Sequence, residues 1–236
     1  MKLIIDTKDN INQLVAEEFI KIINSSDHPV IGLATGSTPL GVYNQLAIAN
    51  KKGKVSFKNV HSFNLDEYVG LSEDNEQSYR YFMNHNLFQY IDIDLNNTKV
   101  PTPSTYEHYD EMISKEGGID IQILGLGSDG HIAFNEPNTP FDTLTHLADL
   151  EQSTIIDNSR FFKSIDEVPT KAMTMGLKSI MNAKKIVLIA YGKNKAHAVK
   201  EMIEGPIDIS LPASILQKHN DVTIYCDSDA ASLLTK

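Results

Sequence analysis

Cysteine, long hydrophobic runs and positive charge are all scarce in this 236-residue chain. The single cysteine, Cys226, excludes an intramolecular disulfide and favours a reducing compartment. Because it lies in the apolar run VTIYC, we interpret it as a buried structural thiol. No apolar run approaches the length of a membrane span, and the three apolar residues before Asp6 are too few for a signal-peptide core. These absences predict a soluble cytoplasmic protein.

The chain is short of positive charge, with 21 Lys and Arg residues against 31 Asp and Glu residues and a net charge of −10. This balance disfavours nucleic acid or an anionic membrane surface as the main partner. A small anionic substrate would therefore need a local basic pocket. The sequence has no low-complexity run and no Pro/Ser-rich linker, and 41% of its residues are hydrophobic. We expect one large domain over residues 1–236.

Short apolar runs alternate with helical patterns along the chain. The expected strands are residues 3–5, 30–34, 60–65, 119–124, 186–190 and 222–226. The expected helices are a helix capped by Asp9 or Asn10, a helix opened by Thr38 and Pro39, residues 76–90, 106–115 and 169–183, a helix ending near Glu204, a short helix at PASILQKH, and a terminal helix capped by Asp227 or Ser228. Continuously apolar strands between helices predict an α/β fold with a mostly parallel, doubly wound sheet and helices on both faces.

Residues 138–168 have weak periodicity and no long apolar face. A stretch of that length without regular structure, inside a compact domain, is typical of a functional loop or lid. We therefore expect a mobile lid in this segment.

The central motif is LGLGSDGHIAFNEP, residues 124–137, which follows an expected buried strand. It places Asp129, His131 and Glu136 within eight residues. A carboxylate on each side of an imidazole orients the ring and keeps it basic enough to move protons near pH 7. A metal site and a purely structural surface cluster remain alternatives. The glycines of the motif allow sharp turns and close approach of main-chain N–H groups to a ligand; they are Gly125, Gly127 and Gly130.

Asp66 follows directly on another expected strand. A carboxylate held by a sheet suits a base that must approach a carbon-bound proton, although a capping role is the alternative. Its neighbour Glu67 is expected to face elsewhere. Of the other histidines, His61 lies in an expected strand, and six have no clustered partners in the sequence: His28, His85, His108, His146, His197 and His219. All seven are interpreted as structural or surface residues.

A second candidate site is the segment TGSTP, in which Gly36, Ser37 and Thr38 precede an expected helix N-terminus. Such a segment can bind phosphate, although it matches neither the Walker pattern nor GxGxxG and could be only a well-capped helix start. Lys195 in GKNKA and Arg160 in the expected lid could supply positive charge. In a doubly wound sheet the segments TGSTP, DEY, GLGSDGH and GKNK should meet at the carboxyl ends of the strands.

Six ordered blocks resemble the glucosamine-6-phosphate deaminase family over nearly the whole chain. They are TGSTPLGVY, FNLDEYVGL, GLGSDGHIAFNEP, NSRFF, AMTMGL and GKNKAHA. The resemblance implies a Rossmann-like domain that converts glucosamine 6-phosphate and water to fructose 6-phosphate and ammonia. It implies no organic cofactor and no catalytic metal.

The resemblance also implies roles for the residues already singled out. Asp66 would move a proton between C2 and C1 of the sugar. His131 would catalyse ring opening with Asp129 and Glu136 as its partners. The phosphate-binding positions would be Thr38, Arg160 and Lys195, beside Gly36 and Ser37 in the same segment.

Longer members of that family carry an allosteric site with basic residues just after the catalytic loop and a C-terminal extension. Here His146 and Ala148 stand where those basic residues would lie, so we expect no such regulation and a monomer or small homo-oligomer.

The nearest alternative to the deaminase function is a 6-phosphogluconolactonase. Lactonases share the fold and a GLG-D-GH loop but need no base at C2, so the DEY and FNEP blocks favour the deaminase. A sugar-phosphate-sensing module is a second rival, against which stand the complete acid–base set and the lack of a basic helix-turn-helix before Leu3.

Overall fold

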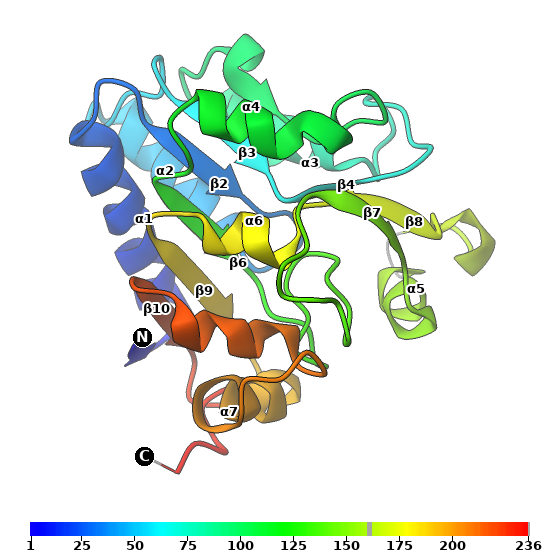
Figure 1. The fold of residues 1–236 in the computed structure, drawn as a ribbon. Coiled ribbons are helices and arrows are strands. Elements are labelled where there is room, and N and C mark those ends of the chain that lie inside the picture. The colour runs from blue at the N-terminus through cyan, green and yellow to red at the C-terminus, as the bar shows by residue number, and fades with distance from the viewer. Residues whose placement is uncertain (160–161, 236) are drawn as a thin grey trace.

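A parallel sheet forms the centre of the molecule (Figure 1). The computed structural model describes residues 1–159 and 162–235, and within them seven strands follow the order β1-β10-β9-β6-β2-β3-β5. Their bounds are β1 Lys2–Ile5, β2 Val30–Leu33, β3 His61–Asn64, β5 Thr98–Lys99, β6 Ile121–Leu124, β9 Ile186–Ala190 and β10 Val222–Cys226. All six expected strands lie in this sheet and are confirmed, and within it only the two-residue edge strand β5 was not expected from the sequence.

The strand order reverses between β2 and β6. From β2 the chain continues outward through β3 to β5, and from β6 it continues outward in the other direction through β9 to β10. A crevice forms at such a reversal, outside the carboxyl ends of the two strands. Residues 34–38 and 125–131 follow β2 and β6 directly, so both candidate binding segments emerge into this crevice.

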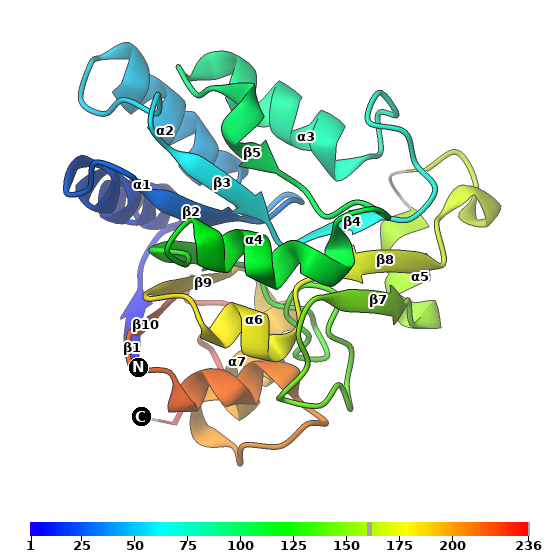
Figure 2. The same cartoon turned by 45° about the horizontal axis from the view of Figure 1, so that its top comes forward.

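Helices cover both faces of the sheet, which confirms the expected α/β architecture (Figure 2). On one face lie α1 (Lys8–Asn24), α2 (Leu40–Lys51) and α3 (Tyr79–Asn86), and on the other lie α4 (Tyr109–Lys115), α6 (Leu177–Met181) and the 3-10 helix η6 (Pro212–Lys218). The remaining helical elements are α7 (Ala196–Glu204), α5 (Gln152–Ser159), η1 (Phe88–Tyr90), η2 (Leu95–Asn97), η3 (Tyr106–His108), η4 (Ile165–Glu167) and η5 (Lys193–Lys195). No helix among the described residues is both long and apolar enough to cross a bilayer.

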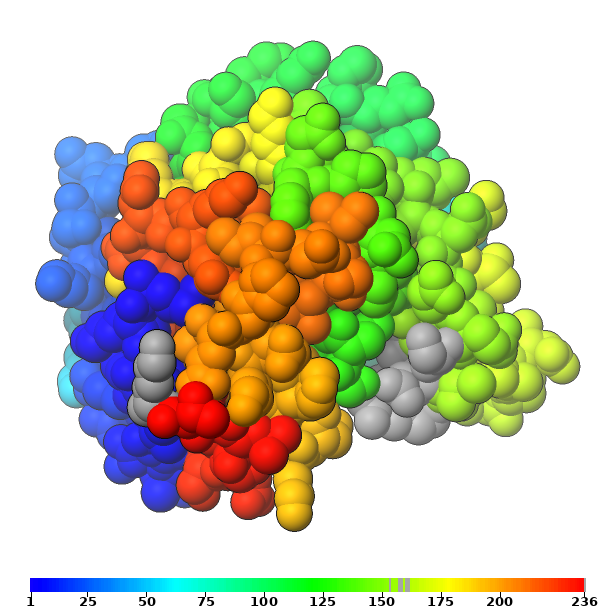
Figure 3. Space-filling view, turned by 60° about the horizontal axis from the view of Figure 1, so that its bottom comes forward, coloured from blue at the N-terminus to red at the C-terminus, as the bar shows by residue number. Residues whose placement is uncertain are grey.

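The core follows from the apolar periodicity of these elements. Helix α1 buries Ile11, Val15 and Phe19, which recur on one face at helical spacing. Every residue of β2, β6, β9 and β10 is buried, including Cys226, which confirms its interpretation as a structural thiol. The two ends of the chain lie close together on one face, shown blue and red in Figure 3.

A smaller antiparallel sheet lies beside the main one, in the order β4 (Asp66–Tyr68), β8 (Lys171–Thr174), β7 (His146–Asp149). The expected helix over residues 169–183 is therefore wrong, since its first part is β8 and only α6 is helical. Pairing decides this outcome, because β8 makes ladders with β4 on one side and β7 on the other. These tertiary hydrogen bonds outweigh the local helix preference of the segment.

Residues 138–168 are more regular than the sequence indicated, because they include β7, α5 and η4. Strand β7 pairs with β8 at the edge of the small sheet. The yellow-green end of this segment forms one flank of the molecule, opposite the blue N-terminal helix (Figure 3). The expectation of an irregular loop is wrong, whereas mobility of the segment stays a prediction.

Several helix boundaries differ from those expected. Helix α1 is capped by Thr7, whose hydroxyl accepts a hydrogen bond from the N–H of Asn10, and not by Asp9 or Asn10. Helix α3 begins after Ser78 and stops at Leu87, where φ is −140°, so residues 76–90 are not one helix. Residues 227–235 form turns and not a terminal helix.

Candidate active site

The four segments expected to meet at the carboxyl ends of the strands do so around one cavity of about 360 Å³. This volume is within the range of small-molecule sites. Lining residues come from TGSTP after β2, DEY in β4, GLGSDGH after β6 and GKNK after β9. Of the candidate residues, those that line the cavity are Gly36, Ser37, Thr38, Asp66, His131 and Lys195.

His131 lies between two carboxylates, as the spacing of the motif predicts. Its Nδ1 atom is 2.7 Å from Oδ1 of Asp129 and 3.6 Å from Oε2 of Glu136. Neither contact has the alignment of a hydrogen bond, so the ring nitrogen is held near both oxygens without being bound to one. Geometry of this kind in a ligand-free site commonly tightens when substrate binds.

The close packing of this trio depends on Gly127. A Cβ atom at that position would lie 2.4 Å from Nδ1 of His131 and 2.6 Å from Oδ1 of Asp129. The N–H of Gly127 also donates to the carbonyl of His131 over 2.9 Å and closes the loop. A larger residue would therefore displace the imidazole from its carboxylates.

The imidazole changes the acidity of Asp129. Burial alone would raise the pKa of this carboxyl, but its contacts with the His131 side chain and with backbone N–H groups lower the pKa to about 2. Asp129 is thus ionised at neutral pH and places a negative charge beside the imidazole of His131, which lines the cavity.

Glu136 is almost fully buried, with 7% of its surface exposed. Its Oε1 atom accepts a 2.6 Å hydrogen bond from the hydroxyl of Thr154 on α5. Its Oε2 atom faces His131 and has no hydrogen-bond partner among residues 1–159 and 162–235. Thr154, which the sequence did not single out, therefore connects the expected lid to the acid–base trio.

Asp66 occupies a buried position in β4 and lines the cavity. Burial raises the pKa of its carboxyl to about 8, and the negative charge of Glu67 adds to this rise. A carboxyl with such a pKa can exchange a proton with substrate near neutral pH.

Glu67 faces away from the cavity, as expected. Its carboxylate accepts hydrogen bonds from the N–H groups of Tyr68, Tyr79 and Arg80 over 2.8–2.9 Å. Tyr79 and Arg80 are the first residues of α3, so Glu67 binds the N-terminus of that helix. Glu67 therefore supports the fold beside Asp66, which lines the cavity.

The segment TGSTP forms a cradle at the start of α2. Pro39 caps this helix and no side chain caps it, so the expected capping by the Thr38 hydroxyl is wrong. Among the described residues, the N–H groups of Gly36, Ser37 and Thr38 have no hydrogen-bond partner. Gly36 has a φ of +89°, a conformation that other residues adopt with strain. Donors that point into a cavity at a helix N-terminus are suited to an anion.

Lys195 borders the same cavity at the beginning of α7 and can complement a bound anion. Lys193, two residues earlier, does not line it. Arg160, the other expected basic residue, lies outside the described residues. A small anionic substrate of this acidic protein needs a local basic site. Lys195 and the backbone N–H groups of the cradle can together form one.

An aromatic wall of the cavity was missed in the sequence. Tyr68 packs against Tyr79, Phe134 and Phe162 with ring centroids 4.8–5.9 Å apart. All four rings line the cavity. Tyr68 and Phe134 stand inside the motifs DEY and HIAFNEP, and that position is the signal that could have identified them.

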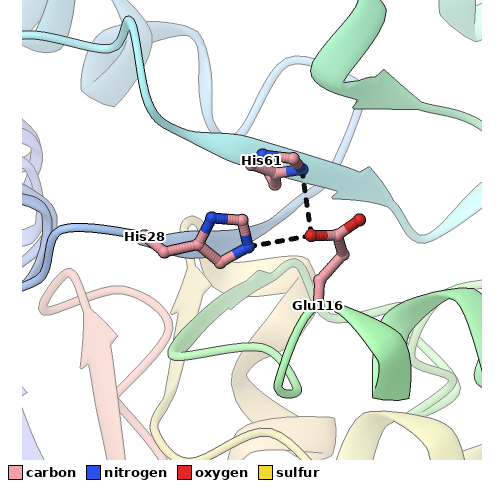
Figure 4. Close-up of side chains that lie close together, drawn as sticks. All are labelled: His28, His61 and Glu116. Carbon is pink, nitrogen blue, oxygen red and sulfur yellow. Dashed lines mark hydrogen bonds and ion pairs between the residues drawn. The ribbon is translucent and has the colours of Figure 1, made fainter.

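The expectation that His28 lacks a clustered partner is wrong, whereas His61 lies in a strand, β3, as expected. Both imidazoles contact the carboxylate of Glu116, as Figure 4 shows. Within the described chain, two groups of side chains have the spacing to hold a metal ion, His28–His61–Glu116 and Asp129–His131–Glu136. In each group the possible ligand atoms lie within 4.8 Å of one another.

The fold and this cavity define a class of protein. A doubly wound sheet presents a buried carboxyl with a raised pKa, a histidine between carboxylates, and an anion cradle around one cavity. This combination suits proton transfer on a small phosphorylated substrate.

The model of the family described as glucosamine-6-phosphate isomerases/6-phosphogluconolactonase matches residues 6–225, and the chain belongs to this family. A glucosamine-6-phosphate deaminase of Mycoplasma mycoides is 52% identical over 239 residues, covering 100% of this chain and 98% of the relative. The solved structure of a monomeric glucosamine-6-phosphate deaminase superposes with a TM-score of 0.96 at 41% identity, covering 99% and 100% of the two chains.

The lactonase branch of the family is more distant. The structure of a 6-phosphogluconolactonase from Thermotoga maritima superposes with a TM-score of 0.74 at 23% identity, covering 95% of this chain and 97% of that one. Identity at this level shows a shared fold and no more. The resemblance noted from the six sequence blocks is confirmed.

Proposed function

We propose that this enzyme converts glucosamine 6-phosphate and water to fructose 6-phosphate and ammonium. The observation that carries the proposal is Asp66, a buried carboxyl with a pKa of about 8 in the wall of a cavity that also presents His131 and an anion cradle. Relatives about half identical over the whole chain are deaminases of this amino sugar phosphate. The steps below assign this chemistry to residues of the chain.

The phosphate of the substrate would bind at the cradle. Backbone N–H groups of Gly36, Ser37 and Thr38 would donate to its oxygens, and Lys195 would balance its charge. Arg160 remains a proposed phosphate ligand from the sequence. Anchoring the phosphate at one end orients C1 and C2 of the sugar toward the acid–base groups.

His131 would open the pyranose ring. Its imidazole would take the proton of the C1 hydroxyl, and the imidazolium would return this proton to the ring oxygen O5 as the C1–O5 bond breaks, which yields the open-chain aldehyde. Asp129 and Glu136 flank Nδ1 and stabilise the imidazolium that forms. Thr154 holds the Glu136 carboxylate in place for this step.

Asp66 would then move a proton from C2 to C1. The carboxylate removes the C2 proton to form an enolamine, and the carboxylic acid returns the proton to C1, which leaves an imine at C2. Water adds to this carbon, and the resulting carbinolamine releases ammonia and the ketone. Carboxylates near the nitrogen stabilise the cationic forms on this path.

The raised pKa of Asp66 favours an amino sugar over a lactone. In the ligand-free enzyme this carboxyl is mostly protonated at pH 7. The ammonium group on C2 of glucosamine 6-phosphate would bring positive charge beside it, and an opposite charge lowers the pKa of a carboxyl. Binding of the correct substrate would thus ionise the base, whereas a lactone without an amino group would leave it protonated.

The remaining proposals concern the setting of the reaction. The enzyme would work in the cytoplasm as a monomer or small homo-oligomer, without organic cofactor or catalytic metal and without nucleic-acid or membrane partners. It would show hyperbolic kinetics, because His146 and Ala148 stand in β7 where basic effector ligands are expected in longer relatives. A sigmoidal rate curve that N-acetylglucosamine 6-phosphate makes hyperbolic would refute this proposal on regulation.

The test is to measure ammonia from glucosamine 6-phosphate and acid from 6-phosphogluconolactone with the same preparation. We expect ammonia and no enzymatic lactone hydrolysis. Lys195→Ala should raise KM for glucosamine 6-phosphate by about tenfold or more, since a charge-assisted contact to phosphate is lost, while the control Lys193→Ala should not. Lactone hydrolysis without ammonia would refute the deaminase, and equal KM values for the two variants would refute the phosphate site.

A further inference from the structure

A second group of convergent side chains lies far from the cavity. His28 precedes β2, His61 is the first residue of β3, and Glu116 caps the end of α4. Since the strands are parallel, these positions lie at the amino ends of β2 and β3, whereas the cavity lies at the carboxyl ends. None of the three residues lines the cavity. The proposed reaction gives this group no role.

The three side chains aim at one point (Figure 4). Nε2 of His28 lies 2.8 Å from Oε2 of Glu116, and Nδ1 of His61 lies 3.3 Å from the same oxygen. The two rings stand with their centroids 4.3 Å apart and their planes inclined by 46°. Two imidazole nitrogens and one carboxylate oxygen therefore converge from three separate elements.

These spacings are close to those around tetrahedral zinc. With Zn–N and Zn–O bonds of about 2.0–2.1 Å, the ligand atoms of a tetrahedron lie about 3.3–3.4 Å apart. One contact in the cluster already has this spacing, and the other needs to open by roughly half an ångström. His28 keeps half of its side chain exposed, so an ion and a water molecule can reach the cluster from solvent.

The backbone holds the three positions in place. The N–H of His61 donates to the carbonyl of Pro29, next to His28, over 2.9 Å. Behind Glu116, the N–H groups of Gly117 and Gly118 donate back to the last turn of α4, to Ser114 and Ile113. Because these positions are already ordered, ion binding costs little conformational entropy. A preorganised ligand set therefore binds an ion more tightly than a flexible one.

We propose that His28, His61 and Glu116 form a Zn²⁺ site, with water as the fourth ligand. The ion would join the end of α4 to the start of β2 and β3, and would replace the direct contacts of the imidazoles with Glu116. Because the site lies at the edge of the sheet opposite the cavity, its effect is on the stability of the fold and not on the chemical step. The acidic character of the chain favours cation binding in general.

The test uses the metal-free full-length protein and two probes, Zn²⁺ in calorimetry and Co²⁺ in visible absorption. We compare the wild type, the double variant His28→Ala/His61→Ala, the conservative variant Glu116→Gln and the control His108→Ala. His108 is a matched control because it also faces a glutamate, Glu111, at 3.8 Å on the surface. The three variants leave the proposed catalytic residues intact.

The wild type and the control should bind one equivalent of Zn²⁺ more than the double variant. The visible spectra of their Co²⁺ complexes should show the intense bands of a tetrahedral site, which the double variant should lack. Zn²⁺ at tenfold excess over its Kd should raise their Tm by roughly 3–6 °C relative to the double variant. Glu116→Gln should weaken binding by about tenfold or more without unfolding the protein. Equal Zn²⁺ stoichiometry in the wild type and the double variant, as when the ion binds only at Asp129–His131–Glu136, would overturn the proposal and leave the deaminase assignment untouched.

Discussion

The pKa of one buried side chain determines how the reaction should depend on pH. In the proposed mechanism Asp66 must be ionised to take the C2 proton, and in the ligand-free enzyme its pKa is raised to about 8 by burial and by Glu67. The profile of kcat/KM reports the groups of the unbound enzyme. We therefore expect kcat/KM to rise with pH up to about 8. A profile that is flat from pH 6 to 9 would contradict the raised pKa.

The same carboxyl should lower the stability of the fold. Its pKa is raised above the ordinary value of 3.8, so the folded protein binds more protons than the unfolded chain between pH 4 and 8. In that window the contribution of Asp66 becomes less favourable as pH rises. Asp66→Asn should increase the free energy of unfolding by about 1–3 kcal/mol at pH 8, with a smaller gain at pH 5. Urea denaturation at the two pH values measures this, and a variant less stable than the wild type at pH 8 would contradict it.

Thr154 offers a test of how the lid segment acts on the trio. Thr154→Ala removes the only hydroxyl donor to the Glu136 carboxylate found among the described residues, so the carboxylate and His131 lose their fixed arrangement. We expect kcat to fall by about tenfold while KM changes little, because the phosphate cradle is untouched. Thr154→Ser should restore kcat.

The control is Thr145→Ala in the same segment, since the Thr145 hydroxyl has no hydrogen-bond partner in the described part of the chain. A Thr154→Ser variant as slow as Thr154→Ala would mean that the methyl group, and not the hydroxyl, is required.

At the residue scale the sequence predicted the cluster of Asp129, His131 and Glu136 but not the residues that support it. Asp129, His131 and Glu136 are close in sequence, so their spacing alone predicts a cluster. Thr154 reaches Glu136 only through the packing of α5, which no local pattern reveals. His28 and His61 meet Glu116 for the same reason, through the register of β2 and β3.

At the scale of elements, helix α3 depends on a carboxylate from the small sheet. Glu67 accepts three backbone N–H groups, two of them from the first turn of α3. Glu67→Gln keeps the shape but loses charge and one acceptor oxygen, so we expect a loss of about 1–2 kcal/mol in the free energy of unfolding. The variant should also move the rise of kcat/KM to lower pH, because the negative charge beside Asp66 is gone.

Glu73→Gln, at an exposed position before the same helix, is the control for this prediction. Both the stability and the pH profile should remain those of the wild type in this variant. A Glu67→Gln enzyme with unchanged stability would show that α3 does not need the carboxylate.

Strands could be predicted from the sequence where all of their residues are apolar. Strands such as β9 and β10 are continuously apolar, and their bounds were predicted to the residue. Strand β8 was mistaken for part of a helix because its pairing partners, β4 and β7, lie far away in the sequence. Long-range pairing of this kind leaves no local signature.

At the scale of the whole molecule, the parallel sheet places the reaction site. The order of strands reverses between β2 and β6, and the segments after both strands enter one cavity. This arrangement follows from the alternation of strands and helices and was predictable from the sequence. The small antiparallel sheet was not, although it carries Asp66 and connects it to the segment 138–168.

The most direct test of the account is ammonia release from glucosamine 6-phosphate by the wild type, Asp66→Asn and the control Asp149→Asn, with a metal chelator present. Asp149 is an exposed carboxylate of the same small sheet, paired with Lys171. The wild type and the control should release ammonia at equal rates, and Asp66→Asn should be slower by about 10²–10⁴-fold. An Asp66→Asn enzyme as fast as the wild type, or a wild type that releases no ammonia under chelator, would contradict the account.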